Sequence, residues 1–296
     1  MVLPPLHATA NAESWLRAWH LDPILAPLLT AAGVGYLIAY QTVQRSGRRP
    51  PPIWRATAYF AGLAALAVAL LGPPDHFNGV LFWVHMVQHL LLMLVAAPLL
   101  VLGRPVSLFL LALPPGPRRR VLRATLGFHP ARRAISLALH PLSVFLLYNG
   151  SFVLWHLPTL YQAAVADPLV HELEHASFFV TALVFWQVLF DPLPWRRRLS
   201  TESAVLLLFA TWMASDLLCA TVTLSGELLY PIYATQPKPW GLSSLGDQRL
   251  GGAMMWAAGG VLYIALLLGR LAYPALRRAG MPRQYARQHS SGRPIL

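Results

Sequence analysis

Charged side chains are scarce in this 296-residue chain. They make up 11% of its residues, against about 25% in an ordinary soluble domain. Acidic residues are especially few, since 11 Asp and Glu stand against 23 Lys and Arg, whereas 56% of the residues are hydrophobic. This shortage of charge excludes an ordinary soluble globular domain. Apolar runs of about 20 residues recur along the whole sequence, and a run of that length can cross a bilayer as a helix.

Cysteine is almost absent, because Cys219 is the single example. One thiol cannot form an intrachain disulfide, and it excludes the paired-cysteine spacing of a zinc ribbon. The sequence also lacks a basic stripe interleaved with aromatic residues, so no nucleic-acid partner is predicted. The arginines behind the net charge of +12 stand in short runs between apolar segments, as expected of cytoplasmic loops beside anionic lipid.

The apolar segments predict an all-α fold, a membrane bundle of seven transmembrane helices. The predicted spans are residues 22–44, 54–72, 79–102, 136–156, 168–190, 203–225 and 248–270. We assign residues 1–276 to one transmembrane domain, in which the apolar segment 103–117 is too short to span and is predicted to lie at the interface. Residues 277–296 are basic and polar, and we expect a disordered cytoplasmic tail.

Arginine runs alternate along the chain. They follow the first, third, fifth and seventh predicted spans, whereas the connections 73–78 and 157–167 contain no Lys or Arg and 226–247 contains only Lys238. Cytoplasmic loops are enriched in Lys and Arg. We therefore expect the N-terminus outside and the C-terminus in the cytoplasm.

Histidines gather in the outer half of the predicted bundle. His85 with His89, and His171 with His175, are i,i+4 pairs, and residues at this spacing stack on one face of a helix. The expected orientation places both pairs at similar depth, where ionisable residues are costly and need a reason. Two such pairs on facing helices can supply four imidazoles to a metal ion. Neutral imidazole suits copper, zinc and iron.

Further groups able to bind a metal are predicted at the same depth. Cys219 and Met255 offer sulfur, which favours Cu(I), and His156 ends the fourth predicted span at the outer side. Asp216, on the sixth predicted span, is expected to bind the ion or to orient a ligand histidine. Three neighbours of the histidine pairs are expected to support the ligands: Glu172, Glu174 and Gln88.

Each of these residues also has a simpler interpretation. A histidine pair near the end of a membrane helix can serve as an interhelical hydrogen-bond donor, and Met255 and Cys219 can be packing residues. Glu172 and Glu174 can face the outer headgroups. Two histidine pairs at matched depth nevertheless favour a metal site over these alternatives.

The segment His171-Glu-Leu-Glu-His175 matches H-E-x-x-H, in which two histidines bind zinc and the glutamate is the general base of a metalloprotease. Asp216 would then be the third ligand. A second histidine pair at the same depth is not expected of a protease, so the sequence favours a binding protein over an enzyme. A zinc-dependent intramembrane hydrolase with Glu172 as base stays open, as does a membrane protein that binds haem between two histidines.

Several stretches between Asp75 and Gly269 together form a specific pattern. They are His85-Met-Val-Gln-His89-Leu-Leu-Leu, Ala97-Pro-Leu-Leu-Val-Leu-Gly-Arg-Pro105, Trp155-His-Leu-Pro-Thr-Leu-Tyr161, His171 and His175 leading to Trp186, Tyr230-Pro-Ile-Tyr233, and Asp247-Gln-Arg-Leu-Gly-Gly-Ala-Met-Met-Trp256. In these stretches the chain resembles the CtaG-type cytochrome c oxidase assembly factors of bacteria. Glu172 is not part of that pattern, which keeps the hydrolase alternative open.

This resemblance implies a seven-helix protein of the bacterial inner membrane that helps to mature a haem–copper oxidase, most simply by supplying copper. The implied partners are cytochrome c oxidase subunits, the surrounding lipid bilayer and a periplasmic copper donor. Copper is accordingly the expected metal, with zinc or haem as the alternatives set out above.

Overall fold

The computed structural model describes residues 17–127, 129–190, 199–235 and 238–279. Every regular element within these residues is a helix, so the predicted all-α class is confirmed. Six helical segments are long and apolar enough to cross a membrane: Leu25–Arg45, Ile53–Phe77, Phe82–Ala112, Pro168–Phe190, Thr201–Leu224 and Ser244–Ala272. They agree with six of the seven predicted spans, with ends displaced by up to ten residues. The protein is therefore a membrane protein.

The fourth predicted span differs from the other six because it is bent. It reaches the length of a span only as two helices, α9 (His129–Ala138) and α10 (Pro141–Trp155), whose axes differ by 59°. Pro141 has no backbone N–H to continue α9, and the residue before a proline is pushed towards extended backbone. His140 accordingly has ψ 139°. Alone, the 15 residues of α10 extend about 22 Å, which is shorter than a bilayer core of about 30 Å.

The third span is a series of short helices. It consists of α5 (Phe82–Leu90), the π-helix η1 (Leu91–Ala96), α6 (Ala97–Leu102) and α7 (Pro105–Ala112). Arg104, with φ 52°, separates α6 from α7. The segment predicted to lie at the interface is thus largely helical: α7 prolongs the third span and packs on α2 (Leu25–Arg45), and α8 (Pro115–Leu126) follows it.

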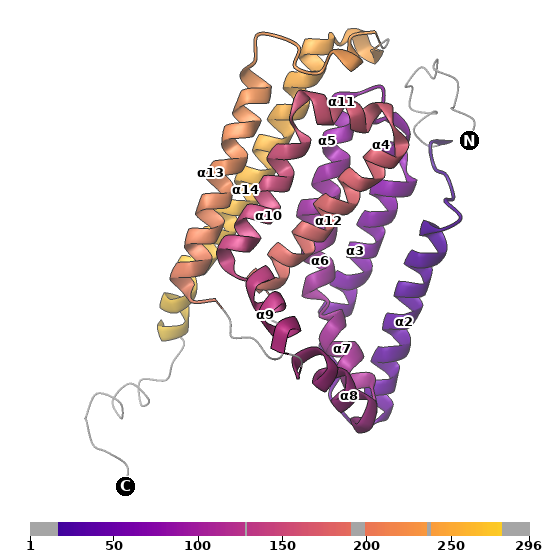
Figure 1. Ribbon diagram of the computed structural model, residues 1–296, viewed down its shortest axis with the longest axis vertical. Coiled ribbons are helices and arrows are strands. Elements are labelled where there is room, and N and C mark those ends of the chain that lie inside the picture. Colours follow the sequence, from indigo (N-terminus) through magenta and orange to yellow (C-terminus); the bar gives the residue numbers. More distant parts are fainter. Residues whose placement is uncertain (1–16, 128, 191–198, 236–237, 280–296) are drawn as a thin grey trace.

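The long helices lie side by side (Figure 1). At one side of the bundle α13 (Thr201–Leu224) pairs with α14 (Ser244–Ala279), and α14 also packs on α5. In the middle, α12 (Pro168–Phe190) packs against α10 and α6, and α3 (Ile53–Leu71) packs against α6 and η1. Residues 277–279 were predicted to begin a disordered tail, but they belong to α14. The rest of that predicted tail, residues 280–296, lies outside the described residues.

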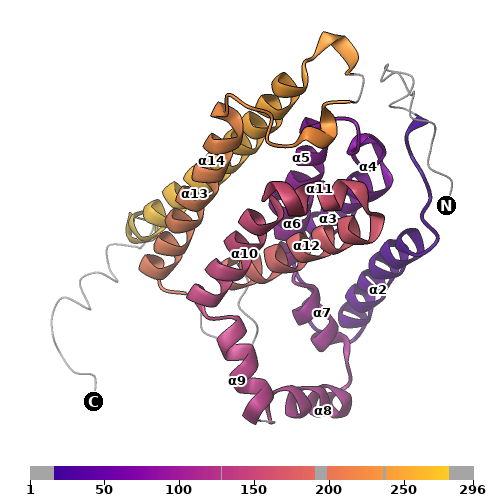
Figure 2. The same cartoon turned by 45° about the horizontal axis from the view of Figure 1, so that its top comes forward.

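Short helices cover one end of the bundle. They are α4 (Pro73–Phe77), α11 (Pro158–Ala166), η2 (Pro231–Tyr233) and η3 (Pro239–Gly241). Figure 2 shows α4 beside α5 and α11 beside α12, whereas α8 and α9 lie at the opposite end. The four short helices that cover this end come from the connections between predicted spans, where sequence periodicity gave no expectation of structure.

Asp247 determines where α5 begins. Its carboxylate accepts hydrogen bonds from the backbone N–H of Phe82 at 2.9 Å and of Trp83 at 3.0 Å. The first N–H groups of a helix have no partner within it, and a negative charge is favourable at this end. Lys238 lies 3.0 Å from the same carboxylate, and both side chains are almost fully buried. The connection before α14 is thereby attached to the histidine-bearing helix.

Candidate metal centre

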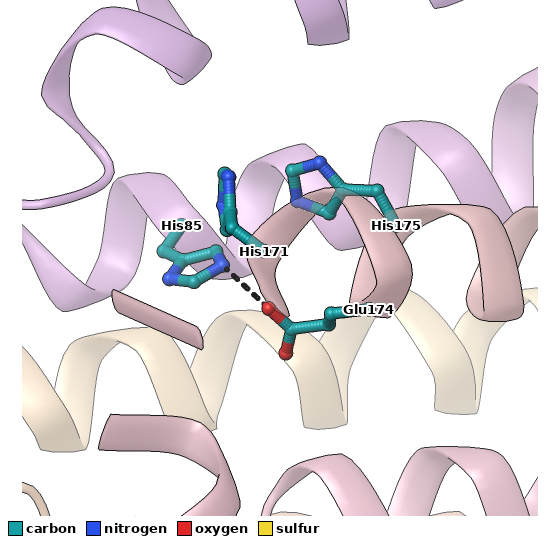
Figure 3. Close-up of side chains that lie close together, drawn as sticks. All are labelled: His85, His171, Glu174 and His175. Atoms are coloured by element: carbon teal, nitrogen blue, oxygen red, sulfur yellow. Dashed lines mark ion pairs between the residues drawn. The ribbon is translucent and has the colours of Figure 1, made fainter. Parts of the chain in front are cut away.

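The two predicted histidine pairs face each other across the interior of the bundle. His85 lies on α5, whereas His171 and His175 lie on α12. One ligand atom from each of these residues and one from Glu174 lie within 4.8 Å of one another. Figure 3 shows the four side chains converging from the two helices. We call this group the imidazole–carboxylate centre.

His89 and His156 extend the centre into a cluster of five imidazoles. The ring centroid of His89 lies 4.4 Å from that of His85, 5.4 Å from that of His175 and 6.1 Å from that of His156. His156 follows the last residue of α10. Three helices therefore bring together all five histidines predicted as ligands, and His85, His89, His156 and His175 are buried.

Glu174 has a more central position than the sequence indicated. It is fully buried, with its two carboxylate oxygens 3.5 Å from His85 Nε2 and 3.7 Å from His89 Nε2. His171, Glu174 and His175 follow the i,i+3,i+4 spacing that places residues on one helix face. Glu172 is on another face and is exposed. The same spacing rule, applied to the glutamates, could have identified Glu174 from the sequence.

Tyr161 and Tyr233 determine the protonation of the His85 ring. Tyr233 Oη donates to the carbonyl of Asn78 at 2.7 Å, because a carbonyl can only accept. Every contact of this hydrogen-bond chain is satisfied when Tyr161 Oη donates to Tyr233 Oη at 3.0 Å and His85 Nδ1 donates to Tyr161 Oη at 2.8 Å. Burial raises the pKa of both phenols well above the usual value, so both keep their protons. His85 Nε2 therefore presents a lone pair.

His156 presents a lone pair for a similar reason. Its Nδ1 donates to the carbonyl of Phe152 at 2.7 Å, which leaves Nε2 unprotonated in a neutral ring. This Nε2, both ring nitrogens of His89 and both oxygens of Glu174 are buried with no hydrogen-bond partner among the described residues. Buried polar atoms are nearly always paired. A bound cation would pair them, so the residues fit a metal ion held by neutral imidazole and carboxylate.

Gln88 forms hydrogen bonds with α3 and α4 at the edge of the centre. Its amide nitrogen donates to the carbonyl of Ala69 at 3.0 Å and to Asp75 Oδ1 at 2.8 Å. Its oxygen accepts from Asn78 at 3.2 Å, and the Asn78 amide nitrogen lies 3.5 Å from His171 Nε2. Gln88 thus connects α3, α4 and α5 to the edge of the centre.

The remaining predicted residues lie outside the imidazole–carboxylate centre. Cys219 on α13 and Met255 on α14 are buried and line a cavity together with His89. Asp216 is half-buried on α13 and does not belong to the group of converging ligand atoms found among the described residues. Sequence reasoning assigned no site role to Tyr161 or Tyr233, although both stand in the stretches that carry the family resemblance.

These features define an integral membrane helical bundle with a buried imidazole–carboxylate centre near one end. The model of the cytochrome c oxidase caa3 assembly factor family, Caa3_CtaG, matches residues 34–274. The chain belongs to this family, and the resemblance predicted from its sequence is confirmed.

The chain is also similar to mycobacterial proteins described as uncharacterised. It is 27% identical to one from Mycobacterium leprae over 270 residues, which cover 88% of this chain and 40% of that protein. It is 28% identical to one from Mycobacterium bovis over 250 residues, covering 82% and 37% respectively. The chain thus spans about two-fifths of the length of these relatives. No solved structure matches it.

Proposed function

We propose that the protein binds copper at the imidazole–carboxylate centre and supplies it to a cytochrome c oxidase during assembly. The family is one of oxidase assembly factors, and copper is a metal that a haem–copper oxidase must receive. The observation that carries the proposal is the contact between His85 Nε2 and Glu174 Oε2 at 3.5 Å. The hydrogen-bond chain leaves a lone pair on this nitrogen, so a cation between the two atoms would stabilise them.

Each residue of the centre has a part in binding the ion. His85, His171, His175 and Glu174 would be direct ligands, because their ligand atoms converge. His89 and His156 continue the cluster and supply further lone pairs. Neutral imidazoles keep the charge of the buried site low, and the single carboxylate offsets part of the charge of the bound ion.

The geometry favours this function over the two alternatives. A hydrolase of the H-E-x-x-H type needs Glu172 beside the ion as the base, but Glu172 is exposed and the buried glutamate is Glu174. A haem needs a flat slot between its two axial imidazoles. Here the ring centroids of His85 and His171 are 5.1 Å apart, and Glu174 lies beside them.

The orientation that we propose places the centre towards the periplasm in a bacterial inner membrane, with the chain crossing seven times. The arginine-rich helix α8 lies at the end of the bundle opposite to α4 and α11 (Figure 1). By the positive-inside rule that end faces the cytoplasm. The centre would then accept copper from a periplasmic donor and pass it to an oxidase subunit in the same bilayer. Reporter fusions at both termini test this topology.

Copper binding by the purified protein in detergent tests the proposed function. We expect the wild type to bind copper and His171→Ala to lose most of that affinity, with a matching fall in the copper content of the oxidase in cells that carry the variant. His129→Ala is the control, because His129 is exposed on α9 at the opposite end. Absence of copper from the wild type, or equal binding by His171→Ala, would overturn the proposal.

A further inference from the structure

A cavity adjoins the imidazole–carboxylate centre, between α5 with η1, α10, α13 and α14. Four of its lining residues carry atoms that bind soft metal ions: His89, Met93, Cys219 and Met255. They come from four different elements, and all four side chains are buried. Methionine and cysteine are ordinary packing residues when they occur singly. Here two thioethers and the chain's single thiol line the same cavity as an imidazole.

His89 is the observation that points to a ligand rather than to packing. It is 1% exposed, and neither of its ring nitrogens has a hydrogen-bond partner among the described residues. An unpaired imidazole in an apolar interior is costly. His89 lines the cavity on one side, and its Nε2 lies 3.7 Å from Glu174 Oε1 in the centre. His89 therefore lies between the cavity and the imidazole–carboxylate centre and contacts both.

The backbone is irregular at this point. The π-helix η1 begins two residues after His89 and contains Met93, and π-helices occur frequently at functional sites. The Met93 carbonyl accepts a hydrogen bond from Trp186 Nε1 at 2.7 Å, so α12 stabilises the irregular turn. On another wall Gly259 contributes no side chain, and a Cβ there would contact only Tyr263, at 3.7 Å.

We propose that this cavity is a second, softer copper site that takes Cu(I) from the imidazole–carboxylate centre. The inference rests on the proposed function, because it assumes that copper reaches the first centre. His89 would be shared, with Cys219, Met93 and Met255 completing the soft site. Thiolate and thioether ligands select Cu(I), whereas the first centre offers only imidazole and carboxylate.

Charge balance supports binding by the thiolate. When Cu⁺ binds to Cys219, the thiol loses its proton to water and a copper–sulfur bond replaces the S–H bond. One positive charge enters and one leaves, so the net charge of the cavity is unchanged and the oxidation state of copper stays the same. An uncompensated charge in this apolar interior would be strongly unfavourable.

Anaerobic titration of the full-length protein with Cu(I), against a competing chelator, tests the second site. X-ray absorption at the copper edge then identifies the ligand atoms. We expect the wild type to bind a second equivalent with copper–sulfur scattering. Cys219→Ser and Met255→Leu should each weaken this scattering, because each removes one of the three sulfur ligands, while the copper bound through nitrogen and oxygen is kept. Met255→Leu nearly conserves volume, so it should fold even where Cys219→Ser does not. Met86→Leu, at a buried methionine that is not a lining residue, is the control.

Three outcomes relate this inference to the proposed function. Copper bound through nitrogen and oxygen alone, and unaffected by Met255→Leu, would overturn the second site and leave the first intact. If the wild type binds no copper, both proposals fail. Copper–sulfur scattering that persists in His171→Ala supports a site with its own ligands.

Discussion

The hydroxyl of Tyr161 lies 2.8 Å from Nδ1 of His85, and this contact determines which ring nitrogen is available to a ligand. The chain of hydrogen bonds ends at the carbonyl of Asn78, which can only accept. Each donor in the chain therefore points towards Asn78, beginning with Nδ1 of His85. Tyr161 and Tyr233 come from the connections outside the long helices, yet they control the protonation of a side chain on α5. The covering elements therefore belong to the site.

Removal of the Tyr161 hydroxyl should weaken copper binding. In Tyr161→Phe, His85 Nδ1 keeps only the longer 3.3 Å contact with Tyr233, and Tyr161→Phe/Tyr233→Phe removes both partners. Loss of groups that orient a ligand histidine usually costs roughly 10–100-fold in metal affinity; we expect the double variant to reach that range and the single variant less. Competition titration with a copper chelator measures this, with Tyr40→Phe on α2 as the control. Unchanged affinity in the double variant would contradict the tautomer assignment.

The two glutamates of α12 should respond in opposite ways. Glu174→Gln removes the buried carboxylate beside His85 and His89, and we expect at least about a tenfold loss of copper affinity. Glu172→Gln changes an exposed side chain and should bind copper as the wild type does. The same titration applied to both variants compares them directly. Loss of function in Glu172→Gln alone would instead favour the hydrolase.

The buried pair of Lys238 and Asp247 should be needed as a pair. Asp247→Asn leaves the Lys238 charge buried and weakens the N-terminal cap of α5, and breaking a buried pair from one side typically costs about 3–5 kcal/mol. Thermal unfolding in detergent should show a large fall in stability. Asp247→Asn/Lys238→Met should recover part of it, because no unpaired charge then remains. A double variant no more stable than Asp247→Asn would argue against the ion pair as the cause.

Close packing of α13 on α14 depends on Gly252. A Cβ at this position would lie 2.9 Å from the backbone nitrogen of Thr223 and 2.5 Å from its Oγ1. We therefore expect Gly252→Ala to separate the helices and to destabilise the protein by about 1–3 kcal/mol, as overpacking usually does. Gly269→Ala is the matched control on α14, because a Cβ there meets nothing within 4 Å. It should be neutral or slightly stabilising in the same unfolding measurement.

Local features of the sequence were enough to predict much of this protein. The length of each apolar run predicted the long helices, because a helix must satisfy its own backbone within the bilayer. The i,i+4 spacing of His85 with His89 and of His171 with His175 placed each pair on one helix face. These properties depend on residues close together in the chain, so they can be read without knowing how the helices pack.

Tertiary structure decided what depends on distant residues. The way α5 and α12 face each other placed Glu174 Oε2 3.5 Å from His85 Nε2, a contact between two different helices. Tyr161 and Tyr233 reached His85 through connections whose course has no periodic signal, and Asp247 capped α5 from 165 positions away along the chain. Such contacts follow from how helices pack and where their connections cross, and the spacing of residues along one helix carries no information about either.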